Sequence, residues 1–474
     1  MKDNEKKDVQ KKKWFPNVFS LLFSFSVIAA ILTWIVPAGS FERIVEDGIT
    51  KVVPGTFSFI EKNPQDLWDI FQALVTAFKN QASLVFMIFF VGAAVSMLET
   101  TKAIDAFFAK IADLAKGKEE IAVFCIMLFL SVGGATGVFG NVTLVLIPIG
   151  IIISQAMGFD KTLGFLMVFL GSFSGFNTGW VNPSTVGVAQ TIAELPMFSG
   201  LGVRVLFHVV NFTISYLFVY AYLRQIRSNP QKSLNYKPGL AKELYMGNSE
   251  NGEVKDVEVT SSQMISMLCM IVGIIIVIIG ALKFGWGTDQ IAATFFGVAF
   301  VMGLTNYKDL NLMMDQFTKG CSKTVTAAFV VGFANAIPVI MKAGGILDTI
   351  VYYLSEPIGY FGDVVGTVIM LFSNIIINFF ITSGSGQASA VMPIMIPICD
   401  LTGITRQVAV QCFQFGDGLS NCIYPTVASL MGGLAFADVS YGKYIKKVLP
   451  LFILQISLAA VAVVILQSIG WTGI

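Results

Sequence analysis

Long apolar stretches along the chain are interrupted by short groups of glycine, asparagine, serine and proline, and the same interruption occurs twice. In the first half FGNVTLVLIP is followed by GSFSGFNTGWVNPST, and in the second half SGQASAVMP is followed by FQFGDGLSNCIYPT. Corresponding landmarks lie about 242 residues apart: Gly92 with Gly332, Gly140 with Gly386, Pro183 with Pro425 and Gly200 with Gly442. Broken apolar helices at corresponding places in two halves are typical of a transporter binding site.

The composition indicates that these stretches lie in a membrane. Hydrophobic residues make up 55% of the chain, charged residues only 13%, and the mean hydropathy is +0.74, whereas a soluble domain is nearer a quarter charged. Several almost charge-free windows reach the roughly 20 residues that a helix needs to cross a bilayer. We therefore expect an all-α polytopic membrane protein surrounded by lipid. The formal net charge of +1 says nothing about partners by itself, and we expect no nucleic-acid partner.

The order of the stretches divides the chain into segments. We expect a cytoplasmic tail over 1–16, a first repeat over 17–223, a cytoplasmic linker over 224–262, and an extra span with a second repeat over 263–474. Within the repeats we expect re-entrant hairpins over 121–156 and 364–399, and broken transmembrane helices over 163–193 and 408–434.

The distribution of basic residues predicts the orientation. The lysine-rich amino end should lie in the cytoplasm, and the extra crossing Met264–Leu282 would turn the second repeat upside down relative to the first. We therefore predict two inverted repeats, with the N-terminus inside and the C-terminus outside. The alternative is chance similarity between two glycine-rich apolar stretches, but the polar landmarks recur in one order at a nearly constant offset.

Polar residues at the breaks form the candidate binding site, because backbone freed inside a membrane must face protein, water or ligand. The substrate-binding candidates are Gly140, Asn141, Thr143, Asn177, Asn182 and Thr185 in the first repeat, and Ser383, Ser385, Gln387, Asp417, Asn421 and Thr426 in the second. Each of these residues could instead serve only to hydrogen-bond one membrane helix to another. Their clustering at two corresponding breaks favours a role in binding.

Asp417 is the most informative of them. It lies inside a span in QFGDGLSN, with no lysine or arginine nearby in sequence, and a charge at that depth costs about 2.5–3.5 kcal/mol even on a lenient scale. The constant offset pairs it with Gly175, so the repeat itself does not require a carboxylate. We expect a counter-ion for a cationic substrate or a carboxylate that couples H⁺ or Na⁺. The alternative is an aspartate that caps a broken helix.

Other chemistry is not indicated. The chain lacks a GxxxxGK[ST] phosphate loop, an HExxH metal motif and a GxSxG serine elbow, so we expect no catalytic residues, no cofactor and no enzyme activity. Its six cysteines show no metal-binding spacing. His208 is the single histidine and is expected to be structural, while Glu194 and Arg204 are expected near the outer interface in structural or gating roles.

At these residues the chain resembles the four-carbon-dicarboxylate anaerobic carrier family of bacterial inner-membrane transporters. The motifs are WIVPAGSFER, VNPSTVGVAQTIAELPMFSG and FGDGLSNCIYPT, and the likeness is strongest to its basic amino acid (arginine/ornithine) antiporter branch. The resemblance implies the ion transporter superfamily, with paired hairpins and broken helices, an elevator motion and a homodimer. The tips Gly140–Thr143 and Ser385–Gln387 differ from the Ser-Asn-Thr tip of sodium-dicarboxylate members, so the coupling ion stays open; Na⁺ near Asn141, Ser385 and Asn421 is one alternative.

These residues are compatible with three functions. Exchange of small organic ions, most of all arginine- or ornithine-type amino acids, is favoured because Asp417 could pair with a cation while helix N-termini take the carboxylate. A Na⁺- or H⁺-coupled four-carbon dicarboxylate carrier is the alternative, but no lysine or arginine falls inside a predicted broken helix. A channel or an intramembrane enzyme is the remote alternative. The chain is expected to be a multi-pass protein of the bacterial inner membrane.

Overall fold

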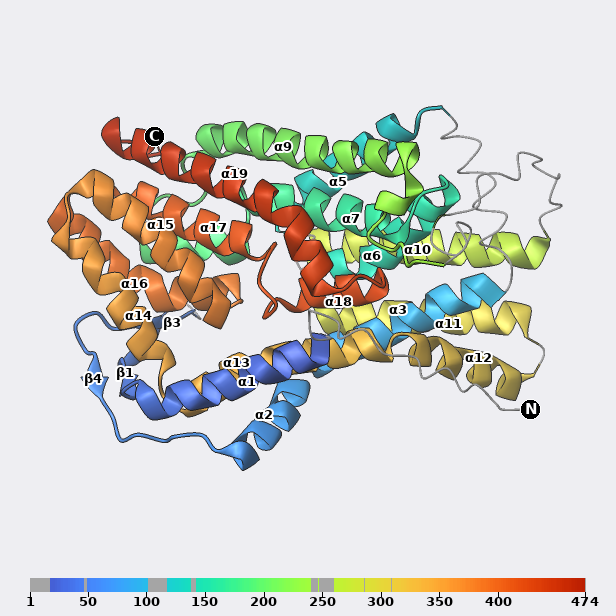
Figure 1. The fold of residues 1–474 in the computed structure, drawn as a ribbon, viewed down its shortest axis with the longest axis horizontal. Helices are drawn as coiled ribbons and strands as arrows, with labels where there is room; N and C mark the ends of the chain where they lie inside the picture. Colours follow the sequence, from blue (N-terminus) through green and yellow to red (C-terminus); the bar gives the residue numbers. More distant parts are fainter. Residues whose placement is uncertain are drawn as a thin grey trace, which may run out of the picture.

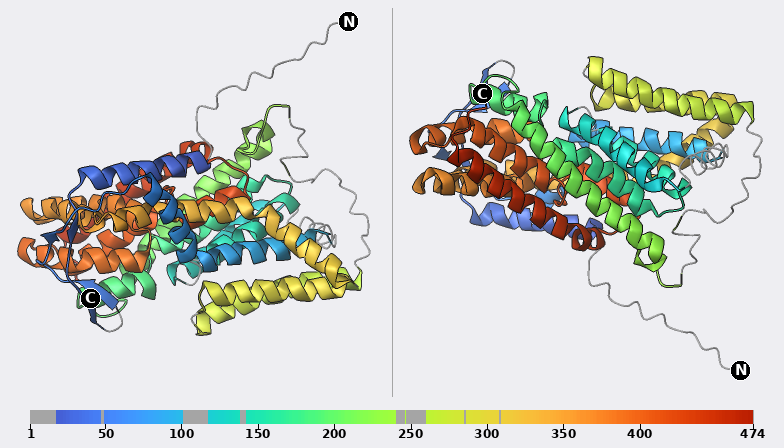
Figure 2. Two further views of the ribbon diagram at one scale, coloured as in Figure 1. Left: turned by 90° about the horizontal axis from the view of Figure 1, so that it is seen from below. Right: turned by 90° about the horizontal axis from the view of Figure 1, so that it is seen from above.

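The structure is a computed structural model that describes residues 18–46, 49–100, 117–137, 142–239, 246, 260–284, 286–307 and 309–473. The expected tail 1–16, the candidates Gly140 and Asn141, and much of the expected linker lie outside these residues. The described chain is nearly all helical, and its helices run mostly along the long axis of the molecule (Figures 1 and 2).

The first half consists of α1 (Val18–Ile35), α2 (Leu67–Asn80), α3 (Ala82–Thr100), α5 (Glu119–Ala135), α6 (Val142–Ala156), α7 (Lys161–Phe176), the π-helical turn η1 (Pro183–Gly187), α8 (Val188–Ile192) and α9 (Leu201–Ser228). After the turn η2 (Pro230–Lys232), the second half consists of α10 (Ser261–Phe284), α11 (Thr288–Asn306), α12 (Leu310–Lys323), α13 (Val325–Ala343), α14 (Leu347–Ser355), η4 (Glu356–Tyr360), α15 (Asp363–Phe380), α16 (Gly384–Thr402), α17 (Arg406–Ser420), α18 (Ala428–Phe436) and α19 (Tyr441–Ser468).

Several helices of the two halves have similar lengths and come in a similar order, while α10 and α14 of the second half have no counterpart among the described helices of the first. The amphipathic helices α2 and α12 have 14 residues each, and the helices that follow them, α3 and α13, have 19 each. The pair α2 and α3 is bent by 64°. The long helices α9 and α19 each have 28 residues. In Figure 1, α5, α6 and α7 lie on the side of the molecule near α10, and α14, α15 and α16 lie at the opposite end.

Several helices are suited to a membrane. Among the described residues α9, α11, α13, α15 and α19 are long and apolar enough to cross one, and the bent pair α2–α3 would add a sixth span. Large apolar side chains such as Leu206 and Ile465 are exposed along these helices. The region facing outward is therefore apolar, as lipid requires.

A small β-structured segment departs from a purely helical fold. Strands β1 (Gly39–Ser40) and β4 (Ser58–Phe59) pair antiparallel, as do β2 (Arg43–Glu46) and β3 (Ile49–Val52). The segment is fixed to α14, where the rings of Phe57 and Tyr352 stack at 4.3 Å. Asp348 accepts a hydrogen bond from the Phe41 amide at 3.0 Å and pairs with Arg43 at 2.6 Å.

Close packing of α5 against α7 depends on glycine. A Cβ atom at Gly175 would overlap the Ser131 carbonyl oxygen, and one at Gly134 would overlap the Ser172 carbonyl oxygen. The two backbones therefore approach as closely as small residues allow in membrane helix pairs. This contact holds the first broken helix against the first predicted hairpin.

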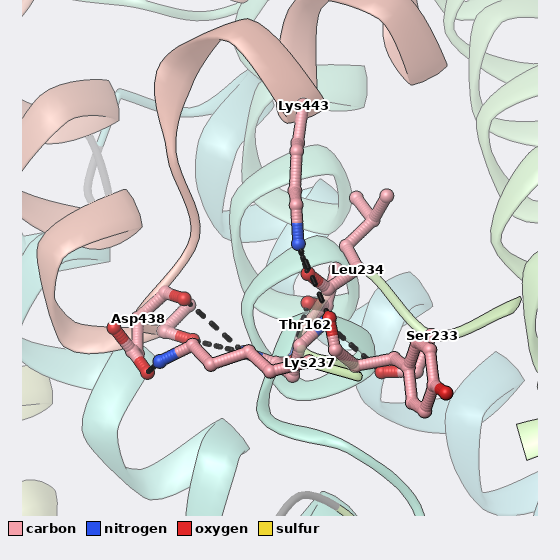
Figure 3. A network of polar contacts seen from close by, with 9 residues as sticks. Thr162, Ser233, Leu234, Lys237, Asp438 and Lys443 are labelled. Carbon is pink, nitrogen blue, oxygen red and sulfur yellow. Dashed lines mark hydrogen bonds and ion pairs between the residues drawn. The ribbon is translucent and has the colours of Figure 1, made fainter. Parts of the chain in front are cut away.

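A short stretch after α9, residues 230–239, ties the two halves together (Figure 3). Asn235 accepts hydrogen bonds from the Thr162 amide and hydroxyl at 3.0 and 2.7 Å and donates one to the Ala437 carbonyl at 2.7 Å. Lys237 pairs with Asp438, and Lys443 donates to the Leu234 carbonyl at 2.8 Å. Residues 230–239, which we call the strap, are thus bonded both to the start of α7 and to the turn between α18 and α19.

The strap also covers a buried carboxylate between α6 and α7. Asp160 accepts from the Leu163 amide at 2.8 Å as the N-cap of α7, and its other oxygen accepts from Tyr222 at 2.6 Å and Ser233 at 2.5 Å. Burial raises the pKa of the Asp160 carboxyl, and these hydrogen bonds oppose the rise. Because all three donors are buried with it, Asp160 anchors the strap to α7 and α9.

Candidate functional site

The first break lies between α7 and η1. Helix α7 ends at the C-cap Asn177, and Asn182 is the N-cap of η1, where its side chain accepts a hydrogen bond from the Ser184 amide at 3.0 Å. Proline at the first position of η1 suits a helix start, since that amide would have no partner in the helix. Asn177, Asn182 and Thr185 are all buried. The break is therefore a polar region enclosed by protein.

The second break follows α17 and is tied to the neighbouring hairpin helix. Asn421 is the C-cap of α17. The Asn378 side chain on α15 donates to the Asp417 carbonyl at 3.1 Å, to the Ser420 hydroxyl at 2.7 Å and to the Asn421 side-chain oxygen at 2.9 Å. Asn378 thus joins α15 to the last turn of α17, where its side chain bonds both side-chain and backbone acceptors.

The two breaks meet. The Gln414 side chain on α17 donates to the Phe176 carbonyl at the end of α7, at 2.6 Å. A Cβ atom at Gly418 would lie 2.5 Å from the Asn177 Cα, so α17 passes directly against the first break. Polar groups from halves far apart in sequence therefore share one buried region.

The tip of α16 completes this region. A Cβ atom at Gly384 would lie 2.5 Å from the Thr185 methyl carbon and 3.1 Å from the Asp417 Oδ2. Glycine is therefore needed at this position, where the first turn of α16 passes between Thr185 of η1 and Asp417 of α17. The structure brings Asn177, Thr185 and Asp417 together with the second predicted hairpin tip.

Asp417 is a buried carboxylate with unused hydrogen-bonding capacity. Its exposed fraction is 0%. The Asn421 amide donates to Oδ1 at a long 3.5 Å, and Oδ2 has no partner among the residues that the structure describes. An isolated buried charge is costly unless it is paired. A cation at Oδ2 would balance the charge, and so would a proton.

Other buried polar atoms around the breaks also lack partners. Within the described ranges these atoms are Asn177 Oδ1, Asn182 Nδ2, Thr185 Oγ1, Thr426 Oγ1, Asn378 Oδ1, Gln387 Oε1 and Gln414 Oε1. Buried polar atoms are nearly always hydrogen-bonded in native proteins. Such a concentration at the breaks indicates a region that binds polar ligand atoms or water.

The remaining sequence candidates have different surroundings. Ser383 is the N-cap of α16, where its hydroxyl accepts from the Gly386 amide at 3.3 Å. Ser385 is exposed and lines a separate cavity. Gln387 points back to α15 and donates to the Asn374 carbonyl at 3.0 Å. Thr143 is buried in α6.

Arg204 lies in the same helical assembly and is bonded by neutral groups within the described part of the chain. It is fully buried, donates to Gln411 on α17 at 3.0 Å and to the Ser199 carbonyl at 2.7 Å, and lies over the Trp471 ring at 5.9 Å. Glu194 is instead exposed and pairs with Arg406 at 2.9 Å. These contacts fit the structural roles expected for both residues.

His208 links the first break to α5 and α7. The Trp180 indole donates to His208 Nδ1 at 2.6 Å, and Nε2 lies 2.7 Å from the Ser131 hydroxyl, which is 2.7 Å from the Ser174 hydroxyl. Because an indole can only donate, Nδ1 accepts and the ring carries its proton on Nε2. Trp180, which lies in the first break, is thus held to the long helix α9 through His208.

Sequence reasoning missed Asn378 and Gln414. Both are polar residues in otherwise apolar stretches, INF and CFQF, which was the available signal. No group of three or more His, Cys, Asp or Glu side chains that could hold a metal occurs within the described residues.

Comparison with known proteins agrees with the site's membrane setting. The model of the family described as C4-dicarboxylate anaerobic carrier (DcuC) matches residues 15–468. "Putative basic amino acid antiporter YfcC" of Escherichia coli is 27% identical, covering 97% of this chain and 98% of the relative. An uncharacterized protein of Haemophilus influenzae is 25% identical, covering 98% and 99%.

Two solved structures are similar at lower sequence identity. The YdaH transporter of Alcanivorax borkumensis is 16% identical with a TM-score of 0.40, covering 97% of this chain and all of that one. MtrF of Neisseria gonorrhoeae is 16% identical with a TM-score of 0.39, covering 96% of this chain and 95% of that one.

Proposed function

The chain belongs to the C4-dicarboxylate anaerobic carrier family, and from this premise we propose that it is a secondary active transporter that exchanges cationic amino acids of the arginine and ornithine type. That it is a multi-pass membrane transporter follows from the family. The amino acid substrate is the proposal, and the name of the Escherichia coli relative supports it.

One observation carries the choice of a cationic substrate: the buried Asp417 carboxylate next to the second hairpin tip. Its Oδ2 has no partner in the described structure, and the first turn of α16 lies against it. A guanidinium or ammonium group would pair with the carboxylate. The N-terminal end of α16 offers amide donors to the α-carboxylate of the same molecule.

A four-carbon dicarboxylate is the second candidate, favoured by the name of the family. It would have to occupy a region that already contains the Asp417 carboxylate. Its two negative charges would rest on helix N-termini, hydroxyls and amides, unless Asp417 were protonated. The local charge therefore favours a cation, and a transport assay distinguishes the two.

Counterflow in proteoliposomes tests the substrate. We expect labelled arginine to enter vesicles preloaded with arginine or ornithine, and vesicles preloaded with succinate to give none. Running the assay with and without a Na⁺ gradient tests whether Na⁺ near Asn141, Ser385 and Asn421 takes part. Counterflow with succinate and none with arginine would refute the proposal in favour of the dicarboxylate carrier.

We further propose that the two halves are inverted repeats that work by an elevator motion, in an inner-membrane homodimer. The recurring helix order supports the repeats, and the family resemblance suggests the motion and the dimer. Lys118 and Gly362 are exposed and directly precede α5 and α15. Single cysteines there, in a background without the native cysteines, should react with impermeant maleimide from opposite sides. Labelling of both from one side would contradict inversion.

A further inference from the structure

A cavity of about 750 Å³ lies between the β-structured segment and the N-terminal part of α16. The β-structured segment contributes Gly39, Ser40 and Arg43 to its lining, and the end of α13 and the start of α14 contribute Lys342 and Asp348. Helix α16 contributes Ser385, Gly386 and Ser389. The volume is within the range of small-molecule sites.

The cavity favours negative charge. Asp348 is already bonded to Arg43 at 2.6 Å and to the Phe41 amide at 3.0 Å, so its charge is largely compensated. Lys342 lines the cavity and is exposed, so the described lining residues carry one net positive charge. The first turn of α16 adds the partial positive charge of a helix N-terminus. A carboxylate is the chemical group that these surroundings attract.

The cavity is also close to Asp417. Ser385 and Gly386 face the cavity, and Gly384, in the same helical turn, lies against Asp417 Oδ2 and Thr185. One turn of α16 therefore separates a positively charged cavity from a buried carboxylate. An amino acid with a cationic side chain carries both complementary groups.

We propose that this cavity is an access subsite that holds the substrate's carboxylate, and that Lys342 is its specificity-determining residue. The inference rests on the proposed function, because it assumes transport through the region around the breaks. Lys342 would select amino acids over amines of equal positive charge. Arg43 has a structural partner in Asp348, so among the described residues that line the cavity Lys342 is the one with a charge free to meet the ligand.

The test compares arginine with agmatine, which is arginine without its carboxylate, as competitors in the counterflow assay. We expect Lys342→Gln to raise the KM for arginine about tenfold, as for loss of one charge-assisted hydrogen bond, with kcat unchanged. Inhibition by agmatine should be unchanged or stronger, because a repelling positive charge is lost. Lys342→Arg should restore the KM. Lys62→Gln is the matched control, because Lys62 lies on the segment after the strands but does not line the cavity.

Three results would overturn the subsite: an unchanged arginine KM, equal changes for arginine and agmatine, or the same change in Lys62→Gln. If the wild-type protein carries succinate and not arginine, the proposed function fails. The subsite is then assayed with succinate, for which Lys342→Gln should again raise the KM about tenfold. An unchanged succinate KM would overturn the subsite in that case too.

Discussion

We expect the Asp417→Asn variant to fold normally and to lose arginine counterflow by about 10- to 100-fold or more, the cost of one charged hydrogen-bonding partner. Asparagine keeps the size of the side chain, so packing against Gly384 is preserved. It removes the charge that would pair with a guanidinium. The measurement is the initial counterflow rate in proteoliposomes, with thermal unfolding in detergent to verify folding.

The control for this variant is Asp315→Asn, which removes an exposed carboxylate on α12 and should leave transport unchanged. Arginine counterflow at the wild-type rate in Asp417→Asn would refute the counter-ion role. If the substrate is instead a dicarboxylate, Asp417→Asn should have the opposite effect on transport. Removing a negative charge beside a bound dianion should preserve or increase succinate transport, because the repulsion between like charges is lost.

The Gly175→Ala variant should be strongly destabilised. Its Cβ would overlap the Ser131 carbonyl oxygen of α5, and a backbone atom cannot move aside as a flexible side chain can. Overpacking typically costs about 1–3 kcal/mol, and separating α5 from α7 would also weaken the first break. We expect a lower melting temperature and reduced transport.

Gly297→Ala is the matched control, since Gly297 also lies within a helix but has no atom within 4 Å of its built Cβ. It should melt at the wild-type temperature or slightly above, because alanine favours helix over glycine by about 1 kcal/mol. Equal melting temperatures for the Gly175→Ala variant and the wild type would show that α5 and α7 pack less closely than described here.

Helix breaks can be predicted from the sequence, but how the breaks meet cannot. Glycine, asparagine and proline disturb helices locally, so 163–193 and 408–434 could be read without tertiary information, and η1 and α18 follow breaks in those ranges. The Gln414 bond to the Phe176 carbonyl and the Asn378 bonds to α17 depend on which helices pack together. A single sequence does not encode that locally.

The alignment of the first half with the second was also not fixed by the sequence alone. A constant offset pairs Asp417 with Gly175. The C-caps Asn177 and Asn421 instead pair it with Phe173, because the first break has more residues between its C-cap and its proline than the second. In neither register does the first half carry a carboxylate at that position. The break lengths differ, so an offset measured at the prolines does not hold along the preceding helices.

The contact between Trp180 and His208 makes the protein its own spectroscopic probe. The chain contains one histidine, so a sample labelled with ¹⁵N-histidine gives a pair of imidazole signals that needs no assignment by mutagenesis. The Nδ1 signal reports the hydrogen bond from Trp180. Any rearrangement that draws the first break away from α9 would shift this signal, and a titration with substrate could follow that movement without an attached label.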